Sequence, residues 1–303
     1  MPEVRSPTVS RRELGALLRA LRNEKGLTVE QVAEQLLCST SKVSRMETGH
    51  SLATPRDIRD LCNLYEVTDR AGRDRLMTLA RQSREQAWWQ SYDLAYATYV
   101  GLEVEAVAIS AFQSSVIHGL LHTAGYARAS HEGAVPRLDP EQIDKQIEAK
   151  LTRQTILTRH PGPPCFAVVL DEAALHRMVG GREVMAAQLA KIMEVSALPN
   201  VTVQVIPFAM GFHPALESNF TILELADPTP GVVFVEGLIG SVYLERRDDL
   251  TRYRDIFAKL QSVALSPQDT ADLIADLGRR YRKSLRAAFM GYLRRGTVTY
   301  PKL

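Results

Sequence analysis

One segment, residues 28–49, restricts the fold of this chain more than any other stretch: TVEQVAEQLLCSTSKVSRMETG. Its first half has apolar residues at the i, i+3, i+4 and i+7 positions, a spacing that gives a helix one apolar face. Thr28 precedes them as a candidate N-cap, and Gln31 can close a capping box three residues later. The first half is therefore predicted to form a short amphipathic helix that begins after Thr28.

A second short helix is predicted directly after the first. Ser39 is another candidate N-cap, and Val43 and Met46 supply an apolar face. Gly49 can end this helix in the left-handed conformation. Only Leu37-Cys38 separates the two helices, which leaves room for nothing but a tight turn. This is the helix-turn-helix layout, in which the second helix enters the major groove of DNA.

With Val43 and Met46 directed inward, the opposite stripe of the second helix is polar. An arginine on such a stripe can bind guanine O6 and N7 in bidentate fashion, and hydroxyl groups can contact bases or phosphates. Any helix in water has a polar face, so the interpretation depends on the paired caps, the tight turn and the terminal glycine. The stripe holds Thr40, Ser41, Ser44 and Arg45, with Lys42 at its edge.

Residues 27–49 resemble the lambda-repressor-like, or XRE, class of helix-turn-helix domain. The class is marked by A-x-x-L, a short turn and S-x-V-S-x-x-E-x-G. This chain has those residues in register at Ala33, Leu36, Ser41, Val43, Ser44, Glu47 and Gly49. The resemblance implies that the polar stripe faces the bases and that Glu47 pairs with Arg22 of the first helix. Val29 is a departure, because many members have glutamine directly after this cap. A phosphate contact or a hydrogen bond at the lip of the groove, usual in the class, would then be absent.

The flanking residues extend the pattern to five helices. Residues 10–25 place leucines on one face and end at Gly26, Thr54-Pro55 is a typical helix start, and residues 68–86 continue the apolar periodicity. Cations on these helices are candidate phosphate contacts, which position a domain on DNA without reading sequence; a solvated surface role is the alternative for each. The candidate DNA-binding residues are Thr28, Ser39, Thr40, Ser41, Lys42, Ser44, Arg45, Arg11, Arg12 and Arg56.

The chain is too long for one small helical domain. Its 303 residues and 45% hydrophobic content predict two domains. Residues 1–85 hold 15 Lys and Arg against 12 Asp and Glu, residues 86–278 hold 14 against 23, and residues 279–303 hold eight against none. Because the middle of the chain is acidic, DNA contacts are expected in the N-terminal part.

The second domain is predicted to mix helices and strands. Helices are expected at 141–159, 183–197, 250–260 and 267–278. Strands are expected at 165–170, 220–225 and 232–235, and a further strand begins at residue 200. The segment 101–129 is expected to contain a strand or a short helix. The predicted fold is multidomain: an N-terminal all-α five-helix domain plus a C-terminal α+β domain with a mixed sheet of at least four strands. The predicted boundaries are 1–86 for the helix-turn-helix domain, 87–100 for an aromatic linker or hinge, 101–278 for the α+β domain and 279–303 for a basic amphipathic tail.

Five phrases of the second domain resemble, in this order, the actinobacterial domain of unknown function that follows XRE-type domains in WhiJ-like regulators: GLLHTAGYARA, LDEAALHRMVGG, NVTVQVIPFAMGFHP, FTILEL and VVFVEG. The resemblance covers about residues 10–280. Such proteins are described as antitoxin-like, and their genes are typically paired with one for a small partner protein. The resemblance therefore implies that the second domain senses a ligand or binds a partner. His118 and His122 depart from the residues expected at their positions.

Two groups of residues admit a chemical role. His118 and His122 would share one helical face and begin a metal site, but no third ligand is evident in the sequence, and structural roles are favoured. A catalytic cleft would require several polar residues to converge, for which structural or pocket-lining roles are again favoured. Those residues are His213, Glu217, Glu236, Tyr243 and Glu245. No enzymatic activity, cofactor or metal is expected.

Several global features bear on location. The N-terminus lacks the apolar core of a signal peptide and no apolar run reaches 18 residues, so a cytoplasmic protein without stable membrane association is expected. Cys38, Cys62 and Cys165 lie far apart in apolar surroundings and are expected to be buried. The basic tail admits phosphate binding, a membrane surface or dimerisation, but docking on the acidic middle domain is favoured.

The sequence thus predicts a sequence-specific transcription regulator that binds a double-stranded DNA operator, a repressor in preference to an activator. A homodimer is expected, because one recognition helix reads only a few base pairs. The second domain would receive a small-molecule effector or a small protein partner. The alternatives are an antitoxin-like interaction module that autoregulates its own operon and an enzyme with a DNA-targeting head.

Overall fold

The computed structural model describes residues 6–294 except 93, 95, 134–137, 161, 227, 228, 238 and 239, and side chains as far as 283. The chain divides into two compact units. The first comprises residues 1–106 together with 224–231, and the second comprises 107–223 and 232–303. The predicted basic tail therefore lies, beyond Lys283, outside the described side chains. In the part of the chain that is described, no helix is both long and apolar enough to cross a bilayer.

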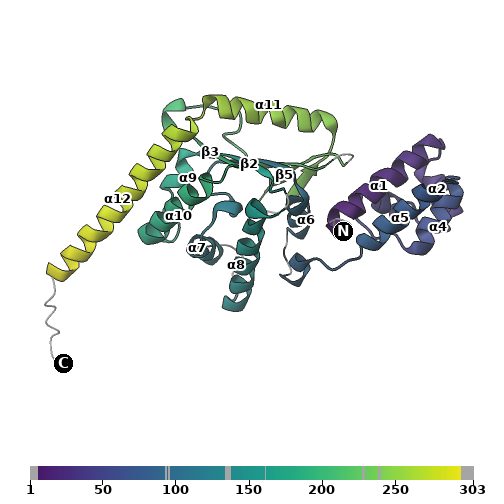
Figure 1. Ribbon diagram of the computed structural model, residues 1–303, viewed down its shortest axis with the longest axis horizontal. Coiled ribbons are helices and arrows are strands. Elements are labelled where there is room, and N and C mark those ends of the chain that lie inside the picture. The colour runs from purple at the N-terminus through teal and green to yellow at the C-terminus, as the bar shows by residue number, and fades with distance from the viewer. Residues whose placement is uncertain are drawn as a thin grey trace. The chain divides into compact units, whose positions relative to one another are not determined.

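The first unit is helical throughout its described N-terminal part. Its elements are α1 (Pro7–Glu24), α2 (Val29–Gln35), α3 (Thr40–Glu47), α4 (Pro55–Leu64), α5 (Arg70–Gln82), the 3-10 helix η1 (Trp88–Tyr92) and α6 (Ala97–Glu105). The predicted five-helix domain is confirmed as α1–α5, whose inward faces enclose one core (Figure 1). This core includes Leu14, Leu18, Val32, Val43, Met46, Ile58, Leu61, Tyr65, Leu76 and Leu79.

Side-chain caps set the helix starts, as the sequence pattern predicts. The Thr28 hydroxyl accepts the Gln31 backbone N–H, and the Gln31 side chain accepts the Thr28 N–H, which completes the capping box. Ser39 accepts the backbone N–H of Lys42 at the start of α3. Helix α5 begins at Arg70, later than the predicted start at residue 68, because Asp69 caps it.

Residues 87–100, predicted as a linker or hinge, are built into the first unit. Helix α6 packs on α1 so closely that a Cβ at Gly101 would lie 2.2 Å from Thr8 Oγ1 and 3.1 Å from the Trp89 ring. The Ser6 backbone N–H also donates to the Glu105 carboxylate. The first unit thus continues to Ala106, beyond the boundary predicted at residue 86.

The second unit is built on a six-stranded sheet. Its strands are β1 (Ala108–Gln113), β2 (Cys165–Asp171), β3 (Val201–Ile206), β4 (Phe220–Glu224), β5 (Val232–Glu236) and β6 (Ser241–Leu244), in the order β3-β2-β1-β4-β5-β6. The pairs β1–β2 and β2–β3 are parallel, whereas β4–β5 and β5–β6 are antiparallel. The predicted α+β domain with a mixed sheet is confirmed. Strand β1 lies in the segment predicted as a strand or short helix, and β6 was not predicted.

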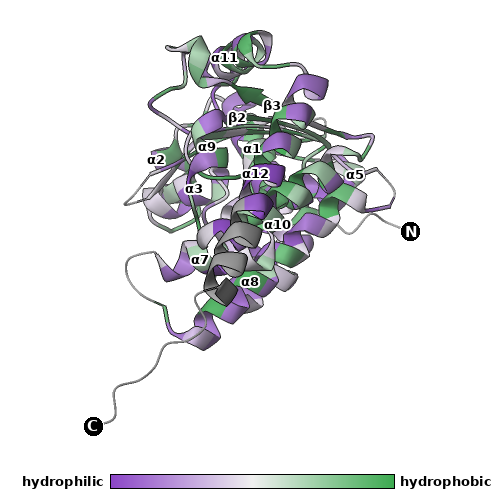
Figure 2. Ribbon diagram, turned by 90° about the vertical axis from the view of Figure 1, so that its left-hand side faces the viewer, coloured by the Kyte–Doolittle hydropathy of each residue, from purple (hydrophilic) through white to green (hydrophobic). Residues whose placement is uncertain are grey.

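Helices cover both faces of this sheet. They are η2 (Gly119–Leu121), α7 (Ala124–Glu132), α8 (Pro140–Gln154), η3 (Thr155–Thr158), α9 (Glu172–His176), α10 (Gly181–Ser196), η4 (Phe208–Met210), α11 (Arg247–Val263) and α12 (Pro267–Arg294). Helix α11 lies along one face, and α7, α8 and α10 lie on the other (Figure 1). Figure 2 shows the same layering from the side, with α11 and α10 on opposite faces. Under α11 the core gathers Phe112, Val169, Ile206, Phe220, Ile222, Val233, Leu250, Phe257 and Leu260.

The three cysteines are free thiols that differ in exposure. Cys62 is buried in the first core, and burial raises the pKa of its thiol. Cys38 is half-buried beside the same core. Cys165 is exposed, so the prediction that it is buried was wrong. It occupies the first position of β2, where the end of the strand is open to solvent.

Candidate DNA-binding surface

Helix α3 presents the polar stripe that the sequence predicts. Val43 and Met46 are buried, with exposed fractions of 1% and 2%. The opposite face consists of Thr40, Ser41, Ser44 and Arg45, which are all exposed. With Ser39 as its N-cap, α3 begins with two short hydroxyl side chains that allow close approach to a groove. Exposed, short side chains at the N-terminus of such a helix are compatible with the recognition helices of helix-turn-helix domains, whose first residues contact base edges.

Helix α3 is fixed from behind by α1. A Cβ at Gly15 would lie 2.6 Å from the backbone oxygens of both Met46 and Glu47, so the two helix backbones nearly touch there. Arg22 also donates two hydrogen bonds to the Glu47 carboxylate, from Nε to Oε1 at 2.7 Å and from Nη2 to Oε2 at 3.0 Å. The hydrogen bond to Glu47 also raises the pKa of Arg22. The ion pair implied by the resemblance is confirmed.

The turn between α2 and α3 contains a residue that the sequence reasoning left without a role. Leu37 has a φ of 50°, in the left-handed region, and its side chain is 94% exposed. The Cys38 N–H donates to the carbonyl of Ala33 and closes the turn. The Leu37 side chain therefore projects into solvent immediately before α3. The only sequence signal was a large apolar residue in a tight turn.

Lys42 is not a free cation. Its Nζ lies 2.7 Å from Asp57 Oδ1 on α4, and its side chain is 42% exposed. Burial alone would raise the pKa of Asp57, but hydrogen bonds from Lys42 and Thr54 lower it below its ordinary value. The Lys42 charge is therefore partly neutralised before DNA arrives. The sequence gave no local signal of this ion pair, because Asp57 is 15 residues away.

The other residues predicted to contact DNA differ in their exposure and in their neighbours. Arg56 is 83% exposed and lies 3.6 Å from Asp60 one turn later in α4. Arg12 packs against the end of α3, where a Cβ at Gly49 would lie 3.0 Å from Arg12 Cγ. Arg11 is half-buried, and burial followed by repulsion from Arg12 lowers its pKa. Thr28 is exposed but its hydroxyl is used in capping α2.

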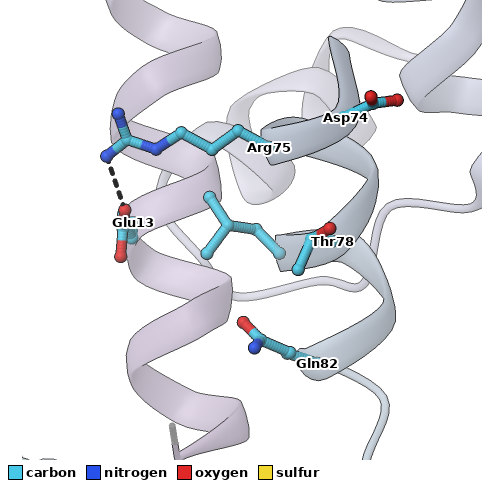
Figure 3. A pocket seen from close by; sticks show the side chains of 6 residues that line it. Glu13, Asp74, Arg75, Thr78 and Gln82 are labelled. Atoms are coloured by element: carbon cyan, nitrogen blue, oxygen red, sulfur yellow. Dashed lines mark hydrogen bonds and ion pairs between the residues drawn. The ribbon is translucent and has the colours of Figure 1, made fainter. Parts of the chain in front are cut away.

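A pocket of about 460 Å³ lies between α1 and α5. Glu13 forms part of its wall and accepts a hydrogen bond from Arg75 Nη2 at 2.8 Å (Figure 3). Asp74, Thr78, Leu79 and Gln82 complete the lining. Glu13 and Gly15 are two residues apart on α1, roughly 200° around the helix. The pocket is therefore on the side of α1 away from α3 and does not belong to the DNA-reading stripe.

The two histidines considered as metal ligands do not share a face of an α-helix. They flank the 3-10 helix η2, with His118 before it and His122 after it. His118 Nδ1 accepts the Leu120 N–H, and His122 Nε2 lies 2.7 Å from the Ile117 carbonyl. His118 packs against Phe166 and His122 against Tyr126. Both rings therefore serve the local structure of this buried segment.

Burial of His122 makes stability depend on pH. Burial, and then repulsion from Lys150, lowers the pKa of His122 to about 3 from an ordinary 6.5. The unfolded chain therefore binds the proton first, and stability is complete above pH 6.5 and falls as the pH drops towards 3. Between pH 6.5 and 5 the loss is expected to be about 1.5 kcal/mol. His131, with a pKa lowered to about 4 by burial, acts in the same direction.

Urea unfolding followed by circular dichroism over this pH range measures the slope. The His122→Gln variant keeps an N–H donor for the Ile117 carbonyl but cannot be protonated, so its slope should be shallower. Wild-type protein measured in the same buffers is the reference for this slope. An unchanged slope in His122→Gln would contradict the assignment.

The strand register separates two of the residues considered for a catalytic cleft. His213 is buried, with Nε2 3.4 Å from Asp171 Oδ2, whereas Glu217 is exposed. Glu236 pairs in register with Ser241, and Leu244 with Val233, so Glu245 lies towards the opposite end of the β5–β6 ladder from Glu236. The strand register thus separates two of the carboxylates by about 13 Å. The sequence could not show this, because β6 was not predicted.

Residues 96–276, more than half of the chain, match the model of a family described as a domain of unknown function, DUF5753. The protein belongs to the DUF5753 family. Residues 13–76 match a helix-turn-helix domain. No curated protein and no solved structure shows significant similarity to the chain.

The two matches identify a DNA-binding regulator with a helix-turn-helix domain followed by a DUF5753 domain. The helix-turn-helix match spans α2 and α3 and includes the polar stripe. The DUF5753 match begins at residue 96, just before α6, although α6 packs in the first unit against α1. The boundary between the sequence families therefore differs from the boundary between the compact units.

Proposed function

We propose that this DUF5753 protein is a cytoplasmic repressor that reads a double-stranded operator through the exposed face of α3. The observation that carries the proposal is the stripe of Thr40, Ser41, Ser44 and Arg45 on a helix held rigidly by Gly15 and the Arg22–Glu47 pair. Rigid presentation reduces the ordering cost of binding. Two copies are needed, because one such helix contacts only a few base pairs.

In this proposal the DUF5753 domain receives a small-molecule effector or a small protein partner and alters operator binding. The support is the resemblance of its ordered phrases to WhiJ-like regulators. The same resemblance supports a second candidate, an antitoxin-like module whose DNA binding serves mainly to regulate its own operon. Co-purification of a small protein encoded by a neighbouring gene would favour that second candidate. Neither candidate assigns a chemical reaction to the protein.

The Arg45→Ala variant tests the proposed reading surface. Selection of bound sequences from a random duplex pool should show relaxed preference at one operator position, with a loss of about 1–3 kcal/mol on the preferred base. Lys42→Ala should instead weaken all sequences alike and lower the salt slope by less than one, because Asp57 already neutralises part of the charge. Lys145→Ala, which removes an exposed cation from α8, is the control. If Arg45→Ala keeps both affinity and preferred sequence, α3 is not the recognition helix.

A further inference from the structure

The turn between α2 and α3 displays the most exposed large apolar residue of the described chain. Leu37 is 94% exposed, ahead of Phe212 at 80%. Its two neighbours behave differently, because Leu36 and Cys38 both pack against the core of α1–α5. A single exposed leucine is ordinary on a protein surface, so exposure by itself does not indicate a contact. The backbone and the position of Leu37 distinguish it from other exposed residues.

The backbone of Leu37 is in a conformation that does not suit leucine. Its φ of 50° lies in the left-handed region, and among the non-glycine residues that the structure describes only Glu66 shares this sign of φ. The left-handed conformation is strained for a leucine, whereas glycine adopts it without cost. Neither core packing nor backbone preference therefore favours leucine at this position. A backbone outlier of this kind points to a role outside the fold.

The turn holds Leu37 in a fixed place relative to α3. The Leu37 N–H donates to the Glu34 carbonyl at 3.1 Å, and the Cys38 N–H donates to the Ala33 carbonyl at 2.9 Å. The next residue, Ser39, is the N-cap of α3. With hydrogen bonds on its own amide and on the next one, the turn positions the leucine before any partner arrives. Contact with a pre-positioned side chain has a small ordering cost.

Leu37 adjoins the proposed reading surface. In helix-turn-helix domains, the N-terminal end of the recognition helix is the end that reaches the base edges. Leu37 lies two residues before the cap Ser39, at this end of α3, and the exposed hydroxyl residues Thr40 and Ser41 follow. The apolar side chain is therefore continuous with the polar stripe of α3.

The chemistry of the side chain selects its contact on DNA. Leucine has neither a charge nor a hydrogen-bonding group on its side chain, so it cannot bind a phosphate or pair with the donors and acceptors of a base edge. In unmodified DNA, the apolar group on the major-groove edges is the C5-methyl of thymine. A leucine that is buried against the major groove at the end of α3 therefore favours thymine.

We propose that Leu37 contacts the C5-methyl group of a thymine that adjoins the bases faced by Thr40 and Ser41, and that it makes the operator preference include this thymine. The inference rests on the proposed function, in which α3 is the recognition helix. Contact between the leucine and the methyl group removes both from water. Loss of the methyl group is expected to weaken operator binding by about three- to tenfold.

Replacing thymine with deoxyuridine, which lacks only the methyl group, tests the contact. The operator is first selected from a random duplex pool, and each of its thymines is then replaced in turn. Wild-type protein should lose about three- to tenfold in affinity at one position of each half-site. Leu37→Gly should bind the thymine and deoxyuridine duplexes equally well at that position. Leu37→Met, which keeps an apolar side chain, should still prefer thymine there.

Glu66→Gly is the matched control. It relieves the same left-handed conformation after α4, away from the start of α3, and should keep the wild-type response to deoxyuridine. Urea unfolding followed by circular dichroism checks the fold of both glycine variants. Leu37→Gly should be at least as stable as wild type, because glycine is unstrained in this turn. Loss of the methyl response then cannot be attributed to unfolding.

Two results would overturn the assignment of Leu37. One is wild-type protein that binds every deoxyuridine duplex as tightly as the thymine operator. The other is a Leu37→Gly variant that keeps the wild-type response, or that is weakened equally on both duplexes, which would indicate a sugar contact. Failure of the proposed DNA function is distinguishable, because selection then yields no preferred sequence for wild-type protein. Failure of the Leu37 contact alone leaves a preferred sequence that still depends on Arg45.

Discussion

Replacing Glu47 with alanine is expected to lower the free energy of unfolding of the first unit by about 3–5 kcal/mol. Arg22 and Glu47 have side chains only 12% and 6% exposed, so removal of the carboxylate leaves a guanidinium with little access to water. Arg22 Nη1 would keep its 2.8 Å hydrogen bond to the Leu27 carbonyl, but the two bonds to Glu47 would be lost. Urea unfolding monitored by circular dichroism measures the change.

A double-mutant cycle separates the pair from its surroundings. Arg22→Met in the Glu47→Leu background removes both charges, and this double variant should be more stable than either single one, because no charge is left buried alone. Arg56→Ala, at the exposed Arg56–Asp60 pair, is the control and should change stability by less than about 1 kcal/mol. Additive losses in the Arg22 and Glu47 variants would mean that the two residues do not act as a pair.

Replacing Gly15 with alanine is expected to destabilise the first unit by about 1–3 kcal/mol and to weaken operator binding. In an ordinary helix this substitution would stabilise by about 1 kcal/mol. Here the new Cβ would lie 2.6 Å from two backbone oxygens of α3, and backbone cannot rotate away as a side chain can. Relief requires α3 to move away from α1, which displaces the reading stripe.

Gly125 in α7 is the matched control for Gly15. Its added Cβ would lie 3.7 Å from Val184, an ordinary contact, so Gly125→Ala should be neutral or stabilising. Thermal unfolding and binding to a selected operator are measured for both variants. Gly15→Ala protein that is as stable as wild type and binds with full affinity would disprove the close contact between α1 and α3.

Short-range signals explain what could be predicted of the DNA-binding surface. Caps at Thr28 and Ser39 act within three residues, so the sequence alone marks where α2 and α3 begin. The apolar pair Val43 and Met46 then decides which face of α3 is exposed. The Arg22–Glu47 pair spans 25 residues and came only from a family resemblance. The fold brings Arg22 and Glu47 together, and no local sequence pattern indicates this contact.

Long-range pairing explains what could not be predicted. The Lys42–Asp57 contact joins two helices and removes a cation that looks free in the sequence. The side chains of strand β6 do not alternate between buried and exposed positions, and the strand is defined by its pairing with β5. Residues 87–100 resemble a linker in the sequence, because the contact between Gly101 of α6 and Thr8 joins segments that lie far apart in the chain. Each of these features depends on contacts that propensity and periodicity do not encode.

The first unit is discontinuous in sequence, since it comprises residues 1–106 and residues 224–231. During synthesis its last piece leaves the ribosome only after another 125 residues have been added. At translation rates of about 5–20 residues per second this takes roughly 6–25 s. The core of α1–α5 draws on residues only as far as Ala80, so it can form in the nascent chain before β1 is made. The compact unit around it gains its last segment only after β4.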